Sequence, residues 1–217
     1  MLSIETINIE KQDNLVIYNL NYPVIKEEQY EKKLINYIND VIHQDVISFK
    51  DVVESEIKTL MRKGNYLSYI NTEYDICYNR NNILSIIVEF SQLSGLYNIT
   101  YANSYNYDID LGRMIKLKDI FKPGIDYINI LNTRLRMELE EDRELFEDLF
   151  TEEELDDYIE TLSISTNQNF YLSDDGIVIC FSSYELDENV PDLLEFKILF
   201  EDCEEYLSKY AKEHILD

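Results

Sequence analysis

Few residues in this chain have the types and the spacing that catalysis requires. His43 and His214 each lack a serine or cysteine at the spacing of a known catalytic motif, and no Gly-x-Ser-x-Gly segment occurs. Cys77, Cys180 and Cys203 are far apart and form no Cys-x-x-Cys pair, so neither a zinc site nor a redox motif is expected. The sequence therefore predicts a protein that is not an enzyme and that uses no metal ion and no cofactor.

Two acidic segments share some features of a cation site. Asp108-x-Asp110-x-Gly112 is similar to the start of a calcium loop, but the glycine stands at the wrong step and a third oxygen ligand is missing. The carboxylates of segment 152–157 point around a helix axis, which is typical of a helix start favoured by the macrodipole. Among the 44 acidic residues of the chain, some pair will always have a spacing suited to glycoside hydrolysis. Such a pair is therefore no evidence for that activity.

The tyrosines favour a binding function. There are 18 of them and no tryptophan. Segment Ser183-Tyr184-Glu185 directly follows a predicted strand, at a position where loops often carry function. Tyrosine offers a large, rigid contact area with a polar group, so Ser183, Tyr184 and Glu185 are the candidate ligand-binding residues. A second group on one side of a predicted strand indicates either a core stripe or a recognition surface: Tyr97, Tyr101, Tyr105 and Tyr107.

Negative charge is concentrated in the second part of the chain. The net charge is -25. Residues 121–217 contribute 27 acidic and 7 basic residues, a net -20, whereas residues 1–120 contribute only 17 and 12, a net -5. Such a surface disfavours nucleic acid and anionic membranes and attracts a cationic protein or peptide. A solubilising surface is the alternative explanation.

The hydrophobic periods predict an α+β fold, in which an antiparallel meander packs against a long helix. A hairpin over 4–22 comes first, then one long helix from about Glu27 to Arg62, whose apolar spacing is interrupted near Asp45. Three strands over 69–109 and a short one from Met114 to Leu117 follow. Leu84, Ile86, Val88 and Phe90 form the sheet face expected to contact the helix.

Pro123-Gly124 marks the one plausible boundary, which divides the chain into 1–122 and 123–217 within one compact unit. The second half is predicted as helix, hairpin, strand and helix. Its first helix carries Ile128, Leu131, Leu135 and Leu139 in a register that continues to Phe146 and Leu149. A capping box at Thr151–Glu154 starts a short helix, and a hairpin over 169–181 and a strand from Phe196 to Phe200 follow. The final helix carries Cys203, Tyr206, Leu207, Tyr210 and Ile215 on one stripe.

Several segments in this order resemble a known family. They are the strand ending in Tyr22-Pro23, the long helix and the meander, followed by Asp108–Arg113, Leu117–Phe121, Asn169–Ile179, Phe181–Glu185, Pro191 and Glu195-Phe196. Together they resemble the RsiV-like domain of bacterial anti-sigma factors over nearly the whole chain. The N-terminal half of that domain is also found in PdaC-like peptidoglycan deacetylases, outside their catalytic domain.

The resemblance implies an extracytoplasmic, non-catalytic domain that binds lysozyme, a strongly basic protein, with its ligand-facing region near Tyr184. Within residues 1–217 no counterpart of the anti-sigma segment or the membrane helix of that family is expected. Because Met1–Glu5 shows no signal-peptide features and no apolar run reaches about 18 residues, a soluble cytoplasmic chain is expected. An extracytoplasmic location is expected instead if the chain is part of a longer exported protein.

Three hypotheses follow for the function. The first is a binding domain that recognises a protein, such as lysozyme, or a ligand related to the cell wall. The second is an intracellular acidic interaction scaffold, and the third is a hydrolase. The oligomeric state is left open.

Overall fold

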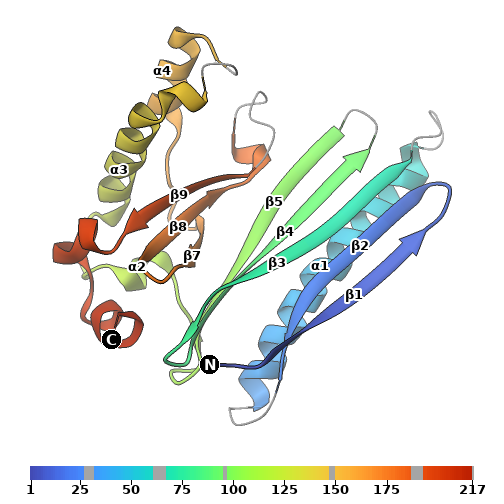
Figure 1. The fold of residues 1–217 in the computed structure, drawn as a ribbon, viewed down its shortest axis with the longest axis horizontal. Coiled ribbons are helices and arrows are strands. Elements are labelled where there is room, and N and C mark those ends of the chain that lie inside the picture. The colour runs from blue at the N-terminus through green and yellow to red at the C-terminus, as the bar shows by residue number, and fades with distance from the viewer. Residues whose placement is uncertain (27–31, 61–66, 95–96, 147–149, 187–192, 217) are drawn as a thin grey trace.

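The computed structural model describes residues 1–26, 32–60, 67–94, 97–146, 150–186 and 193–216. The fold is α+β, as predicted. A six-stranded sheet in the order β1-β2-β3-β4-β5-β6 carries a long helix, and a second sheet has the order β7-β8-β9 (Figure 1). None of the helices in these residues combines the length and the hydrophobicity that a membrane span requires.

The predicted hairpin is formed by β1 (Ile4–Gln12) and β2 (Val16–Ile25). Asp13 builds its turn, since Oδ1 accepts hydrogen bonds from the backbone N–H groups of Val16, at 2.9 Å, and Leu15, at 2.8 Å. These two bonds, assisted by Lys11, lower the pKa of Asp13 to about 2. The turn therefore fixes the register of the two strands.

Helix α1 (Lys32–Leu60) connects β2 to β3 (Ser68–Arg80). The connection places β2 and β3 side by side in parallel, which the sequence did not predict. A parallel pair needs such a crossover, because a tight turn joins only antiparallel strands. The predicted ends of this helix, 27–31 and 61–62, lie outside the described residues.

The apolar spacing is interrupted near Asp45, but α1 runs unbroken through this residue, as the predicted long helix requires. Asp45 lies among the apolar residues that face the sheet, and β5 (Tyr97–Asp108) supplies its partners. Its Oδ2 accepts hydrogen bonds from the Tyr105 hydroxyl, at 2.7 Å, and from Asn103 Nδ2, at 3.3 Å. A polar group on a buried face is tolerated when it is hydrogen-bonded.

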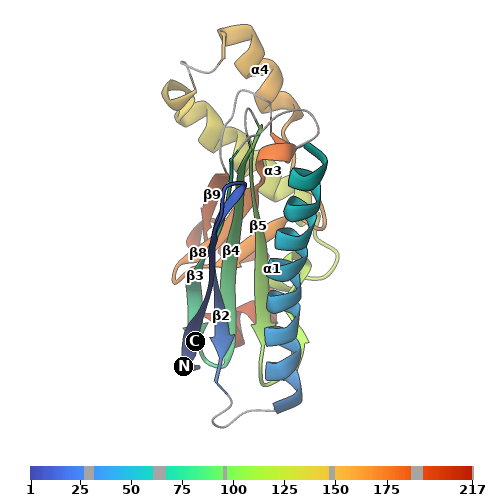
Figure 2. The same ribbon diagram turned by 90° about the vertical axis from the view of Figure 1, so that its right-hand side faces the viewer.

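The predicted meander is confirmed: β3, β4 (Ile83–Ser94) and β5 pair antiparallel. Figure 2 shows α1 lying along one face of this sheet. The predicted contact face of β4 is buried there, in one cluster with residues of α1. From β4 the cluster contains Leu84, Ile86, Val88 and Phe90, and from α1 it contains Ile35, Ile38, Ile42, Val46, Phe49, Val53 and Ile57.

The first half ends differently from the prediction at one point. The strand predicted from Met114 to Leu117 is only β6 (Arg113–Met114), and α2 (Leu117–Ile120) replaces its end. The cause is local, because Asp119 Oδ2 accepts a hydrogen bond from Lys116 N at 2.9 Å and so starts a helical turn.

The elements of the second half follow the predicted order: α3 (Tyr127–Glu141), α4 (Glu152–Thr161), β7 (Asn169–Leu172), β8 (Gly176–Phe181) and β9 (Leu194–Leu199). The capping box is confirmed, since Thr151 N donates to Glu154 Oε2 at 2.9 Å and Glu154 N donates to Thr151 Oγ1 at 3.4 Å. Phe146 is buried beyond the end of α3, and Leu149 lies outside the described residues.

The single final helix that was predicted is wrong. A 3-10 turn over Glu201–Tyr206 and a π turn over Ala211–Ile215 replace it. Between them the chain is extended at Leu207, which bridges to Phe121. The apolar stripe still reaches the core, because Cys203, Leu207 and Ile215 are buried in the same cluster.

The second core cluster contains residues from both predicted halves. From before residue 123 it includes Tyr78, Ile83, Ile115, Leu117, Ile120 and Phe121. The Tyr78 hydroxyl also donates a 2.6 Å hydrogen bond to the Ile215 carbonyl. The second half thus completes its core with side chains from the first, and the division at 122/123 stays a prediction.

The polar side of β5 joins the two halves. The sequence marks this side as polar, but the structure buries most of it against the second sheet. Asn106 Nδ2 donates to the Phe170 carbonyl at 2.7 Å, and Asn106 Oδ1 accepts from Ser85 Oγ at 2.5 Å. Asn169 Nδ2 donates to the Ala102 carbonyl at 2.8 Å. We call this row of contacts the polar seam.

We expect Asn106→Ala to destabilise the fold by about 2 kcal/mol or more, because each buried polar group left without a partner costs about 1–3 kcal/mol. The Phe170 carbonyl and the Ser85 hydroxyl both lose their contact with Asn106. Denaturant unfolding measures the effect. Asn98→Ala, at an exposed position of the same strand face, is the matched control and should change stability by no more than about 0.5 kcal/mol. Equal stabilities of the two variants would contradict the role of the seam.

Candidate functional site

The candidate segment Ser183–Glu185 forms a 3-10 turn directly after β8. Glu185 closes this turn, because its Oε2 accepts a hydrogen bond from Ser182 N at 2.8 Å and its own N–H donates to the Ser182 carbonyl at 2.8 Å. Gln168 Nε2 donates to the other carboxylate oxygen of Glu185 at 3.1 Å. Glu185 therefore holds the turn in place.

Ser183 fastens the same turn to the first sheet. Its hydroxyl oxygen accepts a 3.1 Å hydrogen bond from the backbone N–H of Thr100 on β5. With both neighbours engaged, the Tyr184 side chain is left 69% exposed. The three predicted residues are thus close together but differ in what they do: Ser183 and Glu185 position the turn, and Tyr184 presents a surface.

An aromatic column connects Tyr184 to the core. Its ring centroid lies 6.4 Å from that of Tyr101, which stacks on Phe90 at 4.8 Å with an interplanar angle of 7°. Phe49 of α1 meets the edge of this pair, 5.3 Å from Phe90. Burial, helped by the negative charge of Asp45, raises the pKa of Tyr101 to about 12. The exposed ring therefore stands on a rigid, packed base.

The predicted tyrosine stripe belongs mainly to the core. Tyr105 and Tyr107 are buried between β5 and α1, so the core alternative is confirmed for them. Tyr101 is partly buried under Tyr184, and the side chain of Tyr97 lies outside the described residues. Of the stripe residues whose side chains the structure describes, Tyr101 alone contributes to the site, as the support of Tyr184.

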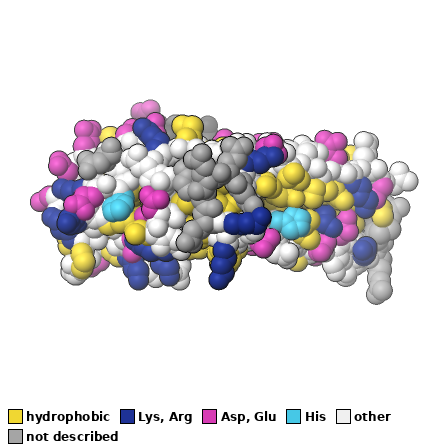
Figure 3. Space-filling model, turned by 90° about the horizontal axis from the view of Figure 1, so that it is seen from below, with side chains coloured by type: hydrophobic (Ala, Val, Ile, Leu, Met, Phe, Trp, Pro, Cys, Tyr) yellow, Lys and Arg dark blue, Asp and Glu magenta, His cyan; other side chains and the backbone are white. Residues whose placement is uncertain are grey.

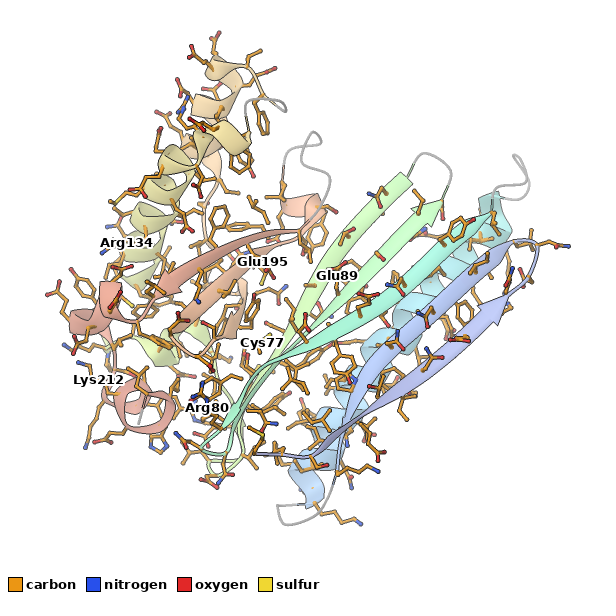
Figure 4. The ribbon with its side chains drawn as sticks, viewed as in Figure 1. Cys77, Arg80, Glu89, Arg134, Glu195 and Lys212 are labelled. Carbon is orange, nitrogen blue, oxygen red and sulfur yellow. The ribbon has the colours of Figure 1, made fainter. Side chains whose placement is uncertain are left out.

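A second feature is an acidic groove between the two sheets, which we call the inter-sheet groove. It has a volume of about 410 Å³. Figure 4 shows Glu89 on β4 and Glu195 on β9 on either side of the gap between the sheets. Glu73 faces Glu89 as its direct cross-strand partner, an arrangement of like charges that costs free energy. No lysine or arginine occurs among the described residues that line the groove. These residues are Glu73, Tyr74, Asp75, Ile87, Glu89, Leu193 and Glu195.

Sequence reasoning missed this groove. The sequence placed the excess of acid after residue 120, whereas three of the four carboxylates come from β3 and β4. The signal that points to it is the position of Glu73 and Glu89 on the outward side of two paired strands. Their approach to Glu195 depends on the docking of the second sheet, which no local pattern reports.

The histidines and cysteines are engaged in packing. His43 Nδ1 lies 3.0 Å from the Tyr22 hydroxyl, and the His214 ring stacks on Tyr210 at 5.0 Å. Figure 3 shows the two histidines at separate places on the surface.

Burial also governs the three thiols. It raises the pKa of Cys77 to about 12 and that of Cys203 to about 11, and it raises the pKa of Cys180 as well. At neutral pH all three are protonated thiols, which are poor nucleophiles.

The acidic segments form local structure. Asp108 Oδ1 accepts a hydrogen bond from Leu111 N at 2.8 Å, and both Asp110 carboxylate oxygens accept from Asn82 Nδ2. Gly112 has φ +64, a left-handed conformation that favours glycine in such a turn. In the part of the chain that the structure describes, no group of three or more His, Cys, Asp or Glu side chains is arranged to hold a metal ion.

These features define an α+β protein in which a polar seam joins a hairpin-helix-meander half to a second sheet. Residues 9–95 match the family model described as "Deacetylase PdaC", and residues 118–188 match that described as "Protein of unknown function (DUF3298)". The PdaC-like part of the expected resemblance is thereby confirmed, and its RsiV-like part stays a prediction.

One curated relative is the peptidoglycan-N-acetylmuramic acid deacetylase PdaC of Bacillus subtilis, 25% identical over 173 residues. The match covers 78% of this chain but 34% of that protein, so the chain spans about a third of its length.

Two solved structures share the fold. A member of the DUF3298 family from Bacteroides fragilis aligns with a TM-score of 0.71 and 20% identity, over 97% of this chain and 95% of the other. A DUF3298 family protein from Pseudomonas aeruginosa aligns with a TM-score of 0.64 and 11% identity, over 96% and 95%.

Proposed function

We propose that this chain is a non-enzymatic binding domain that recognises a basic protein of the lysozyme kind. The observation that carries the proposal is Tyr184, a residue that is 69% exposed on a turn that Ser183 and Glu185 hold in place. Tyrosine is among the residues that dominate protein interfaces when a partner covers them. Because the turn and the column beneath it are already ordered, binding would cost little conformational entropy.

The charge of the chain supports the choice of a basic partner. The net charge is -25, and residues 121–217 account for -20 of it. The inter-sheet groove adds a local concentration of four carboxylates: Glu73, Asp75, Glu89 and Glu195. Complementary charge steers a cationic partner into encounter, while a desolvated aromatic anchor slows its departure.

The state of the reactive side chains favours binding over catalysis. The thiols are protonated at neutral pH, and His43 and His214 contact tyrosines. The acidic interaction scaffold and the hydrolase are the alternatives to the proposed binding domain. A scaffold would lack a discrete anchor, and a hydrolase would need a convergent pair of carboxyl groups with shifted pKa values.

A cell-wall glycan is the second candidate ligand. A groove of about 240 Å³ crosses the sheet face turned away from α1, and its lining includes Tyr69, Asn71 and Asn98. Amide groups donate and accept hydrogen bonds, and an exposed tyrosine ring offers a flat apolar surface. Most of this groove falls within residues 9–95, which match the PdaC model, and the relative of that name is described as acting on peptidoglycan. Retention on insoluble peptidoglycan would distinguish this ligand from a protein.

The salt dependence of binding kinetics tests the proposed function. With lysozyme as the partner, we expect added salt to lower the association rate roughly tenfold or more, because screening shortens the reach of charge from about 10 Å at 0.1 M to 3 Å at 1 M. The dissociation rate should change much less. Biosensor kinetics at two salt concentrations give both rates. An association rate that ignores salt would contradict charge-steered recognition.

A further inference from the structure

Strand β1 is the open edge of the first sheet. It comes first in the strand order, and no other strand of the described residues pairs with its outer side. Figure 1 shows it as the outermost strand, with no ribbon beyond it. An unpaired edge of nine residues presents a row of free backbone groups that another strand can join.

The hydrogen bonds at the two ends of β1 determine which of its residues point outward. Lys26 N donates to the Ser3 carbonyl at 2.9 Å, and Asp13 N donates to the Val16 carbonyl at 3.0 Å. Residues 3 and 13 therefore turn their backbone groups toward β2, and antiparallel pairing alternates this direction at each step. The outward residues are consequently Ile4, Thr6, Asn8, Glu10 and Gln12.

These outward positions allow β1 to pair with a second copy of itself about a two-fold axis at Asn8. An antiparallel pairing in which residue numbers add to sixteen sets Asn8 opposite Asn8, Thr6 opposite Glu10 and Ile4 opposite Gln12. All five outward residues of each copy then face outward residues of the other, as hydrogen-bonded pairs require. The whole length of β1 is used.

The side chains of the remaining positions complement one another in the same register. They lie on the face that carries α1, where Lys11 Nζ approaches Glu54 of the helix at 3.5 Å. Glu5 of one copy comes opposite Lys11 of the other, twice by symmetry, and Ile7 comes opposite Ile9. Ile7 is 38% exposed in the single chain and would be covered. If the pairing shifts by two residues in one direction, Glu5 comes opposite Ile9 and Lys11 passes the end of the partner strand. If it shifts by two in the other direction, Lys11 comes opposite Ile7 and Glu5 passes the end. Of these three registers, only the first pairs the opposite charges.

We propose that two copies of this chain associate through β1 and join their sheets into one continuous sheet of twelve strands. The interface is isologous, since the same strand serves on both sides. Its affinity comes from backbone pairing, and its register is set by the Glu5–Lys11 and Ile7–Ile9 pairs. The net charge of -25 on each copy opposes association, so salt near 0.15 M, with a screening length of about 8 Å, favours the dimer.

Charge reversal tests the proposed pairs. Glu5→Lys sets lysine opposite lysine in its own dimer, and Lys11→Glu sets glutamate opposite glutamate, so each variant alone should dimerise about tenfold more weakly than the wild type. A mixture of the two variants restores both opposite-charge pairs and should recover the dimer. Sedimentation velocity resolves the 25.9 kDa chain from a species of twice that mass. A wild type that stays monomeric up to about 100 µM, or a mixture that fails to recover, would overturn the proposal.

A disulfide tests the register. In hydrogen-bonded pairs Cα atoms are about 5.5 Å apart, which suits a disulfide, so Asn8→Cys should cross-link two copies under mild oxidation. Glu10→Cys lies on the same face, but its two copies would be about 14 Å apart, so it should stay uncross-linked. The wild type controls for the native thiols, of which Cys77 is held in the thiol form by its raised pKa. Equal cross-linking of the two variants would show random collision and contradict the register.

Discussion

Tyr184→Ala is expected to weaken binding of a basic protein such as lysozyme by about 2 kcal/mol, roughly a thirtyfold loss of affinity. The loss should appear as a faster dissociation rate, because the ring would act as the anchor of the formed complex rather than as a source of attraction. The fold should be unaffected, since Tyr184 is mostly exposed and its ring lies tilted at 6.4 Å from that of Tyr101. Biosensor kinetics and thermal unfolding measure the two effects.

Tyr37→Ala is the matched control, since Tyr37 lies on α1 and is 54% exposed. We expect it to leave both rates unchanged. Tyr184→Phe separates the ring from the hydroxyl and should retain most of the affinity if the stacked area dominates. If Tyr184→Ala and Tyr37→Ala behave alike, binding rests on overall charge, and the turn after β8 is not the anchor.

Val88→Asp should destabilise the fold by about 3–5 kcal/mol, because it places a carboxylate without a partner in a buried apolar layer. Val88 is fully buried between β4 and α1, with Phe90 and Val46 in the same cluster. For a chain of this size the loss corresponds to a fall in Tm of roughly 6–20 °C. Thermal unfolding followed by circular dichroism measures it.

Val52→Asp is the control for the same chemical change on the helix, because Val52 is 57% exposed on α1. It should alter stability by no more than about 0.5 kcal/mol. An unchanged Tm for Val88→Asp would show that β4 turns its other face toward the helix, and the core described for the first half would be wrong.

Periodicity predicted those parts of the fold that depend on local patterns. The alternation in β4 and the helical spacing of α1 identified both elements and the faces that meet. What it missed depends on partners distant in the sequence. In the sequence, Asp45 interrupts an apolar stripe. The hydrogen-bond donor that allows it to lie there is Tyr105, 60 residues away, which no local pattern reveals. Likewise the polar side of β5 is buried because β7 supplies hydrogen bonds across the seam.

The candidate site was partly predictable for the same reason. The position of Tyr184 just after a strand pointed to an exposed turn, and the structure places it there. Nothing local indicated that Ser183 would accept a hydrogen bond from β5. The closing of the turn by Glu185 had a local signal, the Ser-x-x-Glu spacing of Ser182 and Glu185, which sequence reasoning missed. The inter-sheet groove needs the two sheets to dock, so composition alone directed attention to the acidic residues of the second half.

The measurement that tests the central proposal most directly is a calorimetric titration of this chain with lysozyme at low salt. We expect saturable binding with about one lysozyme per chain and a Kd of about 1 µM or lower, which corresponds to a binding free energy of about -8 kcal/mol or more negative. Absence of saturable binding with both proteins at roughly tenfold that concentration would contradict recognition of a lysozyme-like protein.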